Sequence, residues 1–415
     1  MARIRSSAQR SYDVVLYGAT GFVGQQTVAY FAKYAKGVHW AIAGRCQTKL
    51  EAVLRDTKVR VPIIVADARD SAALTDLAAS TRVVLSSAGP FGLYGSALVA
   101  SCVQQRTHYV DITGETPWVR AMIDAHHAQA AADGTRIVPC CGFDSVPSDL
   151  GAYLVAQEIK HRYGQACANI KASFSLRGGV NGGTLASVLD ILGKGQSEAF
   201  TNAFLLNPDH KASAADAVHA DPTAPYYDAD FGAWHGPFFR GPVNTRGVRR
   251  SAALWQMDAQ ADSDTAYAED FSYQEYLRFG TGPLAATVAA GMSVGSLASQ
   301  VALRFAPVRK ITAALAPKPG QGPSIRAMDN GSFLCQLMGK SAQGQEVRAV
   351  LSDKGDPGNR ATTKMVCESA LALALDTAVL PGGEQRGGVI TPAFAMGDVL
   401  VQRLRVAGMT LDITP

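Results

Sequence analysis

Three glycines near the start of the chain have the spacing of a turn that binds phosphate. The apolar run 13–17 leads into Gly18, Gly21 and Gly24, so a strand is expected to break into a turn that opens a helix. Gly18 permits a tight turn, Gly21 lets backbone N–H groups approach a pyrophosphate, and Gly24 lets the helix pack closely on the strand. The sequence therefore predicts a dinucleotide-binding turn with these contacts: Gly18, Thr20, Gly21, Phe22, Val23 and Gly24. Because the spacing is G-x-x-G-x-x-G in a chain with 40 glycines, an ordinary strand-to-helix turn is the alternative.

The end of the next apolar run indicates which dinucleotide this turn would hold. Residues 38–43 follow one amphipathic helix and lead into Gly44 and Arg45, where the cofactor ribose is expected. NAD-selective folds place a carboxylate there, and this sequence has none at that position. Arg45 and Lys49, one helical turn later, are suited to clamp a 2′-phosphate. We therefore expect NADP (NADPH), with a surface arginine at a helix start as the alternative.

Further candidate residues follow the later apolar runs. Asp67 comes after the run 61–66 and is expected at the adenine edge, with a helix or turn cap as the alternative. The glycine loop that follows the run 82–86 is expected beside the nicotinamide, and its predicted cofactor contacts are Ser87, Ala88, Gly89 and Pro90. Polar residues with the chemistry to act on a substrate lie at the same edge: Tyr94, Asp111, Cys141 and Asp144.

These residues can meet only if the strands before them end at one edge of a sheet. Short apolar or β-branched runs alternate six times with helical patterns. The expected strands are 13–17, 38–43, 61–66, 82–86, 109–112 and 136–141. Such alternation predicts an α/β protein with a Rossmann-type, doubly wound parallel sheet, whose ligand lies outside the carboxyl ends of the strands.

A length of 415 residues exceeds one typical core and predicts two domains. We expect an NADP-binding Rossmann domain at 1–150 and an α+β substrate domain at 151–385, with an excursion at about 207–250. The remainder, 386–415, is expected to supply a helix and a strand that return towards the first domain. Within the second domain, the predicted strands are 168–177, 247–256 and 265–277, with a hairpin formed by 332–339 and 346–352.

Composition excludes several classes of protein. A formal net charge of +4 is spread along the chain without a basic stripe, so nucleic acid is not an expected partner. Seven cysteines, an odd number, favour reduced thiols over a disulfide framework, and no metal-ligand spacing is present. The basic N-terminus lacks a long apolar segment and a cleavage site, which favours a cytoplasmic location.

The stretch 282–303 contains no charged residue and is rich in alanine, glycine, serine and valine. Its polar residues and glycines dilute its apolarity, so a buried or surface-lying helix is favoured over a membrane span. The functional interpretations are a weak membrane contact, peripheral at the inner membrane, or a wall of a channel for a long apolar chain.

Five motifs resemble those of the saccharopine dehydrogenase-like oxidoreductases: residues 17–24, 43–45, 87–91, 109–115 and 141–151. The resemblance is strongest through residue 151, includes 181–184, and is looser over the rest. Within that family the chain is most similar to the trans-acting enoyl reductases of mycobacteria and their relatives. This resemblance implies an NADPH-bound Rossmann domain, a mixed α/β second domain, and a lipid-like or polyketide acyl substrate of envelope glycolipid synthesis. One form of this expectation has the acyl chain attached to a carrier protein. A homo-oligomer is also left open.

The match to true saccharopine-forming reductases is less complete. Cys141, Gly142 and Asp144 fit their Cys-Gly-x-Asp pattern, but their pattern continues directly into proline, whereas here Ser145 and Val146 intervene. An amino-dicarboxylate substrate would also want several arginines, and Arg177 is the only one expected near a pocket loop. A saccharopine-type dehydrogenase therefore remains an alternative, as does a non-catalytic NADP-binding protein associated with lipid.

Reduction of an enoyl chain needs oxyanion donors and an acid. No tyrosine has a lysine four residues on, so the familiar short-chain pair is excluded. Tyr94 or Cys141 is the expected acid, positioned by Asp111 or Asp144, with water as another source of the proton. Backbone N–H groups at 182–184 are expected to hold the carbonyl. A packed aromatic and a buried thiol are the structural alternatives for Tyr94 and Cys141.

Overall fold

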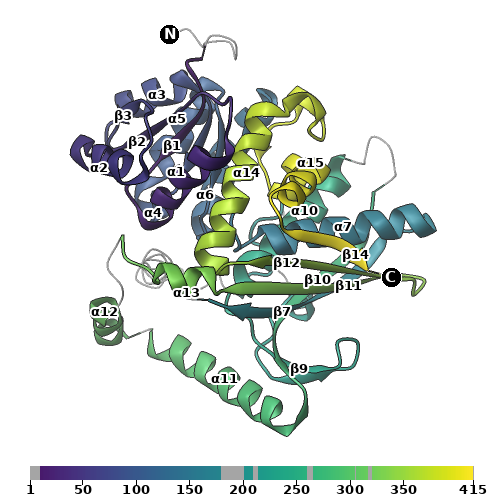
Figure 1. Ribbon diagram of the computed structural model, residues 1–415. Helices are drawn as coiled ribbons and strands as arrows, with labels where there is room; N and C mark the ends of the chain where they lie inside the picture. The colour runs from purple at the N-terminus through teal and green to yellow at the C-terminus, as the bar shows by residue number, and fades with distance from the viewer. Residues whose placement is uncertain are drawn as a thin grey trace.

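The computed structural model describes residues 10–178, 201–208, 214–258, 265–303, 305–315 and 320–414. Two seven-stranded sheets lie one above the other, with helices between them (Figure 1). The expected glycine turn at 178–184 falls almost wholly outside the described residues. No helix in the described part of the chain combines the length and apolarity that a membrane crossing requires.

The first sheet confirms the predicted α/β fold. Its order is β13-β6-β5-β4-β1-β2-β3 and every pairing is parallel. The strands are β1 (Tyr12–Tyr17), β2 (Trp40–Gly44), β3 (Ile63–Val65), β4 (Thr81–Ser86), β5 (His108–Asp111), β6 (Arg136–Val138) and β13 (Gly388–Val389). The central strands are almost fully buried, because helices cover both faces of the sheet. All their carboxyl ends reach one edge, where the predicted site residues begin.

The crossover helices match the alternation in the sequence. They are α1 (Phe22–Tyr34), α2 (Gln47–Thr57), α3 (Ser71–Ser80), α4 (Phe91–Tyr94), α5 (Ser96–Gln105) and α6 (Thr116–Ala132). Local chemistry defines some of their ends: the Asp70 carboxylate accepts hydrogen bonds from the N–H groups of Ala72 and Ala73 and so caps α3. The helix α14 (Thr362–Leu375), from the far end of the chain, packs on α1, β1, β4 and β5.

The second sheet is mixed and has the order β14-β12-β11-β7-β10-β9-β8. Its strands are β7 (Cys167–Arg177), β8 (Tyr226–Asp228), β9 (Ala233–Gly236), β10 (Tyr267–Gly280), β11 (Ser332–Ser341), β12 (Glu346–Lys354) and β14 (Thr410–Thr414). The predicted hairpin is confirmed, since β11 and β12 pair antiparallel from Ser332 opposite Lys354 to Lys340 opposite Glu346. The long strands β7 and β10 pair in parallel at the centre.

One predicted strand is wrong. Residues 247–256 lie inside the helix α10 (Gly241–Asp258). Val248, Ala252 and Trp255 follow helical spacing, and the run has little β-branched content, so the helical period is the better match. The other helices of this part are α7 (Val146–Tyr163), α11 (Gly282–Ala302), α12 (Ala306–Leu315), α13 (Ile325–Asp329), α15 (Pro392–Val406), and the short turns Ala214–His219, Pro357–Ala361, Thr377–Val379 and Gly383–Gln385.

The C-terminal segment contributes to both sheets. β13 extends the first sheet beside β6, whereas β14 pairs with β12 at the edge of the second sheet. The expected excursion at about 207–250 includes β8 and β9, which form an edge of the second sheet, and the first turns of α10. The domain boundaries themselves stay a prediction.

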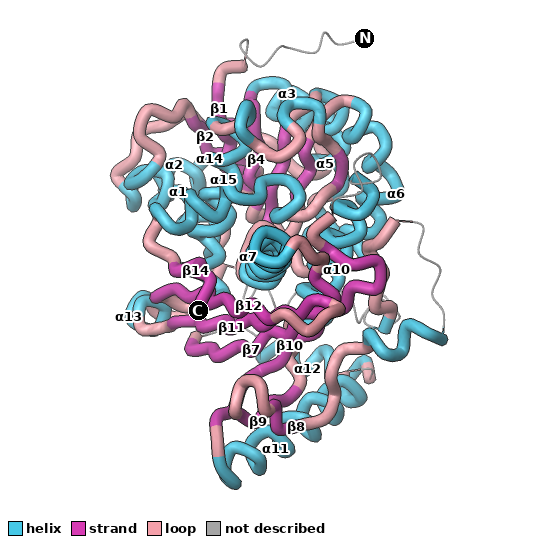
Figure 2. The backbone as a smooth tube through the Cα atoms, turned by 90° about the vertical axis from the view of Figure 1, so that its right-hand side faces the viewer, coloured by secondary structure: helices cyan, strands magenta, loops and turns pink. Residues whose placement is uncertain are grey.

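The two sheets share one hydrophobic core. A single cluster of buried side chains runs from β1 through α7 and α14 to β11 and β12. Figure 2 shows α7 end on between the two sheets. Because the core is continuous, residues distant in sequence are held firmly at the edge where the first sheet ends.

Candidate functional site

A cavity of about 590 Å³ lies at the carboxyl ends of the first sheet and is walled on its other side by the second half of the chain. Every predicted cofactor contact except Gly24 lines it. These residues are Gly18, Thr20, Gly21, Phe22, Val23, Arg45, Lys49, Asp67, Ser87, Ala88, Gly89 and Pro90. The cavity is within the size range of small-molecule and cofactor sites.

Two of the three glycines of the turn, Gly18 and Gly24, have the tight packing that a phosphate cradle needs. Gly18 has φ of +83°, and a Cβ there would lie 2.9 Å from the backbone nitrogen of Ala88. A Cβ on Gly24 would lie 2.2 Å from the carbonyl oxygen of Gly18, which explains why Gly24 packs behind the turn and not in the cavity. Any side chain at these positions would displace the turn, so the backbone is shaped for close approach of a ligand.

Basic side chains gather at the outer end of the cavity. Arg45, just before α2, and Lys49, in its first turn, are exposed and line the cavity, together with Arg69. Among the residues that the structure describes, none of the three pairs with an acidic side chain. Asp67 is nearby and accepts a hydrogen bond from the N–H of Arg69 at 2.9 Å. Burial, together with the nearby Asp67 carboxylate, raises the pKa of Tyr17 to about 12, while the Arg45 guanidinium opposes this shift. This end of the cavity therefore suits an anionic group on a ribose.

The loop beside the expected nicotinamide is held by a buried carboxylate. Glu115, at the start of α6, accepts hydrogen bonds from the N–H groups of Phe91 and Gly92, both at 2.8 Å. The Ser87 hydroxyl donates to the Gly18 carbonyl at 3.2 Å, which joins this loop to the glycine turn. The loop is thus fixed on both sides and its Gly89 and Pro90 face the cavity.

Of the predicted catalytic residues, Tyr94 and Asp144 line the cavity. Asp111 and Cys141 are fully buried beneath its wall. The Asp111 carboxylate accepts from Tyr109 Oη and from the N–H groups of Thr113 and Cys140, so it fastens two strand ends together. Burial raises its pKa to about 7.

Cys141 is placed less favourably than the sequence suggests. Its thiol donates to the Val138 carbonyl at 3.2 Å, and burial raises the pKa of the thiol well above its usual value. Proton donation by Cys141 stays a prediction, and Tyr94 is the better-placed group. The peptide groups of 182–184, expected to hold a carbonyl, lie outside the described residues.

Asp144 forms an ion pair with a residue that the sequence analysis did not identify. Arg240, from the loop before α10, is 8 % exposed and contacts the Asp144 carboxylate. Its guanidinium also stacks over the rings of Phe143 and Phe239, at 5.6 and 5.1 Å. Burial lowers the pKa of Arg240 to about 10, so the side chain stays cationic at neutral pH. Its Nε has no hydrogen-bond partner among the described residues.

The rest of the far wall also comes from positions distant in sequence. Besides Arg240, these are Phe239, Pro242, Val243, Gly320, Gly358 and Thr362. Thr362 opens α14, donates its hydroxyl hydrogen to the Pro357 carbonyl and accepts from the N–H of Phe143. The aromatic residues around 238–239 can be read from the sequence, but no motif or spacing near them indicates that they lie at the cofactor site. Only the shared core brings them there.

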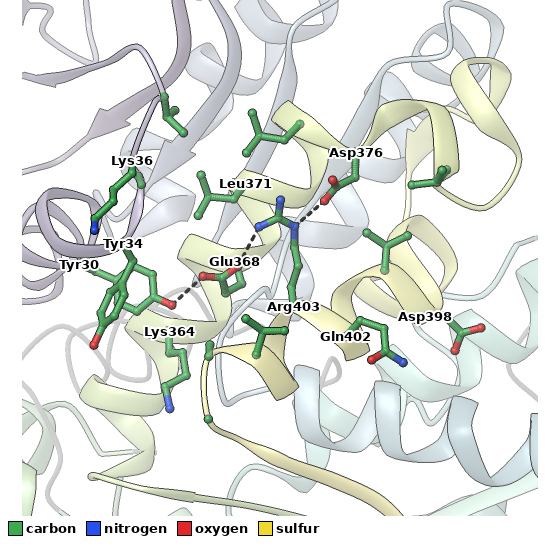
Figure 3. Close-up of a pocket in the computed structure, with 18 residues that line it drawn as sticks. Tyr30, Tyr34, Lys36, Lys364, Glu368, Leu371, Asp376, Asp398, Gln402 and Arg403 are labelled. Atoms are coloured by element: carbon green, nitrogen blue, oxygen red, sulfur yellow. Dashed lines mark hydrogen bonds and ion pairs between the residues drawn. The ribbon is translucent and has the colours of Figure 1, made fainter.

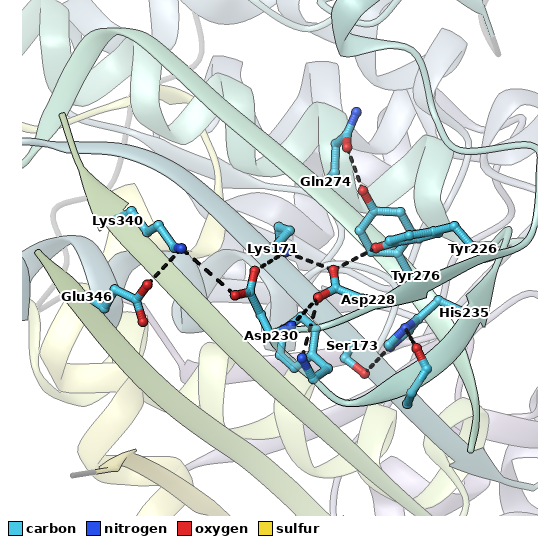
Figure 4. Close-up of polar contacts among 12 residues, drawn as sticks. Lys171, Ser173, Tyr226, Asp228, Asp230, His235, Gln274, Tyr276, Lys340 and Glu346 are labelled. Atoms are coloured by element: carbon cyan, nitrogen blue, oxygen red, sulfur yellow. Dashed lines mark hydrogen bonds and ion pairs between the residues drawn. The ribbon is translucent and has the colours of Figure 1, made fainter. Parts of the chain in front are cut away.

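Two further polar features lie outside this cavity. A groove of about 900 Å³ lies between α1, α14 and α15, where Arg403 pairs with Glu368 and Asp376 (Figure 3). In the second sheet, Lys171 pairs with Asp228 and Asp230 (Figure 4). Neither contains a predicted site residue, and the ion pairs in both are explained by packing of the elements that carry them.

Comparison with known proteins agrees with this geometry. Residues 14–138 match the saccharopine dehydrogenase NADP binding domain family. The chain is 36% identical over 427 residues to a putative trans-acting enoyl reductase of Mycobacterium tuberculosis, covering 99% of both chains. It is 35% identical over 430 residues to a trans-acting enoyl reductase of Mycobacterium bovis, again covering 99% of each.

Among solved structures, the chain resembles the apo form of saccharopine dehydrogenase (L-Glu forming) from Saccharomyces cerevisiae. The TM-score is 0.51 at 14% identity, over 97% of this chain and 99% of that one, so this likeness concerns the fold alone. The full-length identity to the mycobacterial proteins carries the family assignment. The chain is an oxidoreductase with an NADP-binding domain of the saccharopine dehydrogenase type, and it belongs to the family of trans-acting enoyl reductases.

Proposed function

We propose that this protein uses NADPH to reduce the carbon–carbon double bond of an α,β-unsaturated acyl chain. The observation that carries the proposal is the cavity itself, which joins the glycine turn to a buried cation, Arg240, from the second half of the chain. Full-length identity to proteins named trans-acting enoyl reductase supports this reaction class.

The residues present fit NADPH. The N–H groups of Gly18 and Gly21 donate to the carbonyls of Ala43 and Gly18, which fixes the turn. The first residues of α1, Phe22 and Val23, line the cavity and place the N–H groups of the helix N-terminus there for the pyrophosphate. Arg45 and Lys49, with no acidic partner among the described residues, would hold the 2′-phosphate. The loop fixed by Glu115 would lie along the nicotinamide.

When bound, NADPH supplies a hydride equivalent to the β-carbon of the substrate. The chain must then stabilise negative charge on the carbonyl oxygen and deliver a proton to the α-carbon. Arg240 is positioned for the first task, because Asp144 and two aromatic rings hold its guanidinium at the wall. Tyr94, at the cavity edge beside the glycine loop, is our candidate for the second.

The substrate-facing wall favours an acyl chain over an amino acid. Phe239, Pro242, Val243 and Ile112 give it an apolar surface. Three arginines line the cavity, but Arg45 and Arg69 lie at the end assigned to the cofactor phosphate, and Arg177 does not line it. Arg240 is therefore the single arginine on the described substrate side, whereas an amino-dicarboxylate would need several. We therefore propose a lipid-like or polyketide acyl group, presented on a carrier, as in the synthesis of envelope glycolipids.

The test follows a label from cofactor to product. The purified chain is incubated with NADPH deuterated at C4 on the transferred face and with a long-chain trans-2-enoyl thioester. Mass spectrometry should find one deuterium at the β-carbon of a saturated product. NADPH that binds without any product would point to a non-catalytic NADP-binding protein. Turnover only with an amino acid and a keto acid would point to a saccharopine-type dehydrogenase. Either result overturns the proposal.

A further inference from the structure

The helix α11 exposes its large apolar side chains. It packs on β8, β9 and β10, and its buried positions are the small residues Ala285, Ala289 and Ser293. The large residues face away from the protein: Leu284, Val288, Met292, Val294, Leu297 and Val301, with exposures from 45 to 77 %. A surface helix of a globular protein normally buries its large apolar side chains and exposes polar ones. Six exposed large apolar side chains on one helix mark an interaction surface.

The following helix adds aromatic and basic groups to the same arm. Phe305 and Ile311, in and beside α12, are 62 and 61 % exposed. Lys310 on α12 and Arg326 on α13 are also exposed. We refer to the described residues of this stretch, 282–303, 305–315 and 320–326, as the apolar arm. Figures 1 and 2 both show α11 at the edge of the molecule furthest from the first sheet, with one side free.

Charge distinguishes between the partners that such a face could have. Within the arm the sequence contains no aspartate or glutamate, and its described basic residues are Arg309, Lys310 and Arg326. The next acid, Asp329 at the end of α13, pairs with Arg360 outside the arm. A two-fold interface with a second copy would set this cationic surface against itself. An anionic surface would instead be attracted to it.

We propose that the apolar arm docks this protein on the surface of an anionic lipid bilayer. α11 lies along the molecule because its small-residue edge is fixed to the second sheet, so its apolar face would enter the bilayer interface in the plane of the membrane. The exposed lysine and arginine of α12 and α13 would contact lipid phosphates. Docking needs neither cofactor nor turnover, and so stands or falls separately from the proposed reaction.

The arm also leads back to the cavity. Gly320, within the arm, lines the cavity, and a Cβ on Gly322 would lie 2.4 Å from the ring of Phe22 in the glycine turn. If the proposed function holds, the docked arm connects the lipid surface to the wall of the reaction site. An acyl chain partitioned in lipid would then be within reach without release into water.

The test is co-sedimentation of the full chain with vesicles. We expect binding to vesicles of phosphatidylcholine and phosphatidylglycerol in roughly equal amounts, and little binding to phosphatidylcholine alone. Raising the salt concentration should weaken it, because surface charges are screened. The double substitution Leu284→Asp with Leu297→Asp should lower the binding constant at least about tenfold, since charge enters the interface where apolar surface is needed.

Matched controls separate docking from folding. Val218 and Val406 are 75 and 91 % exposed on other elements, and Val218→Asp with Val406→Asp should leave vesicle binding unchanged. Lys310→Glu with Arg326→Glu should weaken binding by about fivefold or more per residue, whereas Lys33→Glu with Arg55→Glu should not. Circular dichroism should show all variants folded, because every substituted side chain is exposed.

Three results would overturn the proposal. The first is no binding to anionic vesicles. The second is equal binding by the arm and control variants. The third is a dimer in light scattering that the Leu284→Asp and Leu297→Asp changes dissociate, which would make a second copy the occupant of this face.

Discussion

Removal of the Glu115 carboxylate should loosen the loop beside the nicotinamide. In Glu115→Ala the N–H groups of Phe91 and Gly92 each lose a charged acceptor at 2.8 Å. A hydrogen bond to a charged group contributes about 1.5–3 kcal/mol, and an orphaned buried donor costs a similar amount. The Phe91 N–H is buried, whereas the Gly92 N–H is partly buried and water can replace its partner. We therefore expect a loss of about 2–4 kcal/mol in the free energy of unfolding.

Urea denaturation followed by tryptophan fluorescence measures this loss. Glu115→Gln should lose about half as much, because one amide oxygen remains to accept. NADPH affinity should fall with both, since the loop lines the cavity. Glu51→Ala is the control: Glu51 makes only a surface hydrogen bond with Gln47, and its loss should cost less than about 0.5 kcal/mol. If Glu115→Ala matched Glu51→Ala in both stability and NADPH affinity, the structural role assigned to Glu115 would be refuted.

Three further predictions concern cofactor choice, chemistry and pH. Arg45→Glu should weaken NADPH at least about tenfold in fluorescence titration and leave NADH nearly unchanged, because only NADPH carries the 2′-phosphate; unaltered NADPH affinity would place that phosphate elsewhere. Arg240→Lys and Tyr94→Phe should each lower kcat about a hundredfold with NADPH affinity kept; full activity in either would remove that residue from the mechanism. Burial raises the pKa of Glu275 from 4.5 to about 8. Between these two values the folded state keeps a proton that the unfolded state has lost, so the free energy of unfolding should fall by about 1.4 kcal/mol for each unit that the pH rises. Glu275→Gln should remove this part of the slope in urea denaturation, and an identical slope would contradict the assignment.

The first sheet could be predicted because its signals are local. Glycines at 18, 21 and 24, a basic residue after the second strand, and alternating strands and helices are each confined to short windows. The structure confirms the parallel sheet, and the cavity includes nearly all the predicted cofactor contacts. The missing one, Gly24, supports the turn from behind.

The substrate side could not be predicted because it depends on tertiary packing. Arg240, Val243 and Thr362 come to the cavity from elements that share a core with the first sheet, and no local pattern marks them. Residues 247–256 were predicted as a strand but belong to the helix α10, so no local pattern indicated that the aromatic residues before this helix reach the site. Cys141 was expected at the carboxyl edge of the sheet, but its side chain is fully buried and its thiol donates to the Val138 carbonyl.

The central claim is that this cavity binds NADPH between the glycine turn and Arg240. Isothermal titration of the full chain with NADPH tests it most directly. The account predicts saturation at one NADPH per chain, with binding abolished by Gly18→Val, whose Cβ would collide with Ala88. No saturable heat with the wild-type chain, or equal binding by the folded Gly18→Val variant, would contradict it.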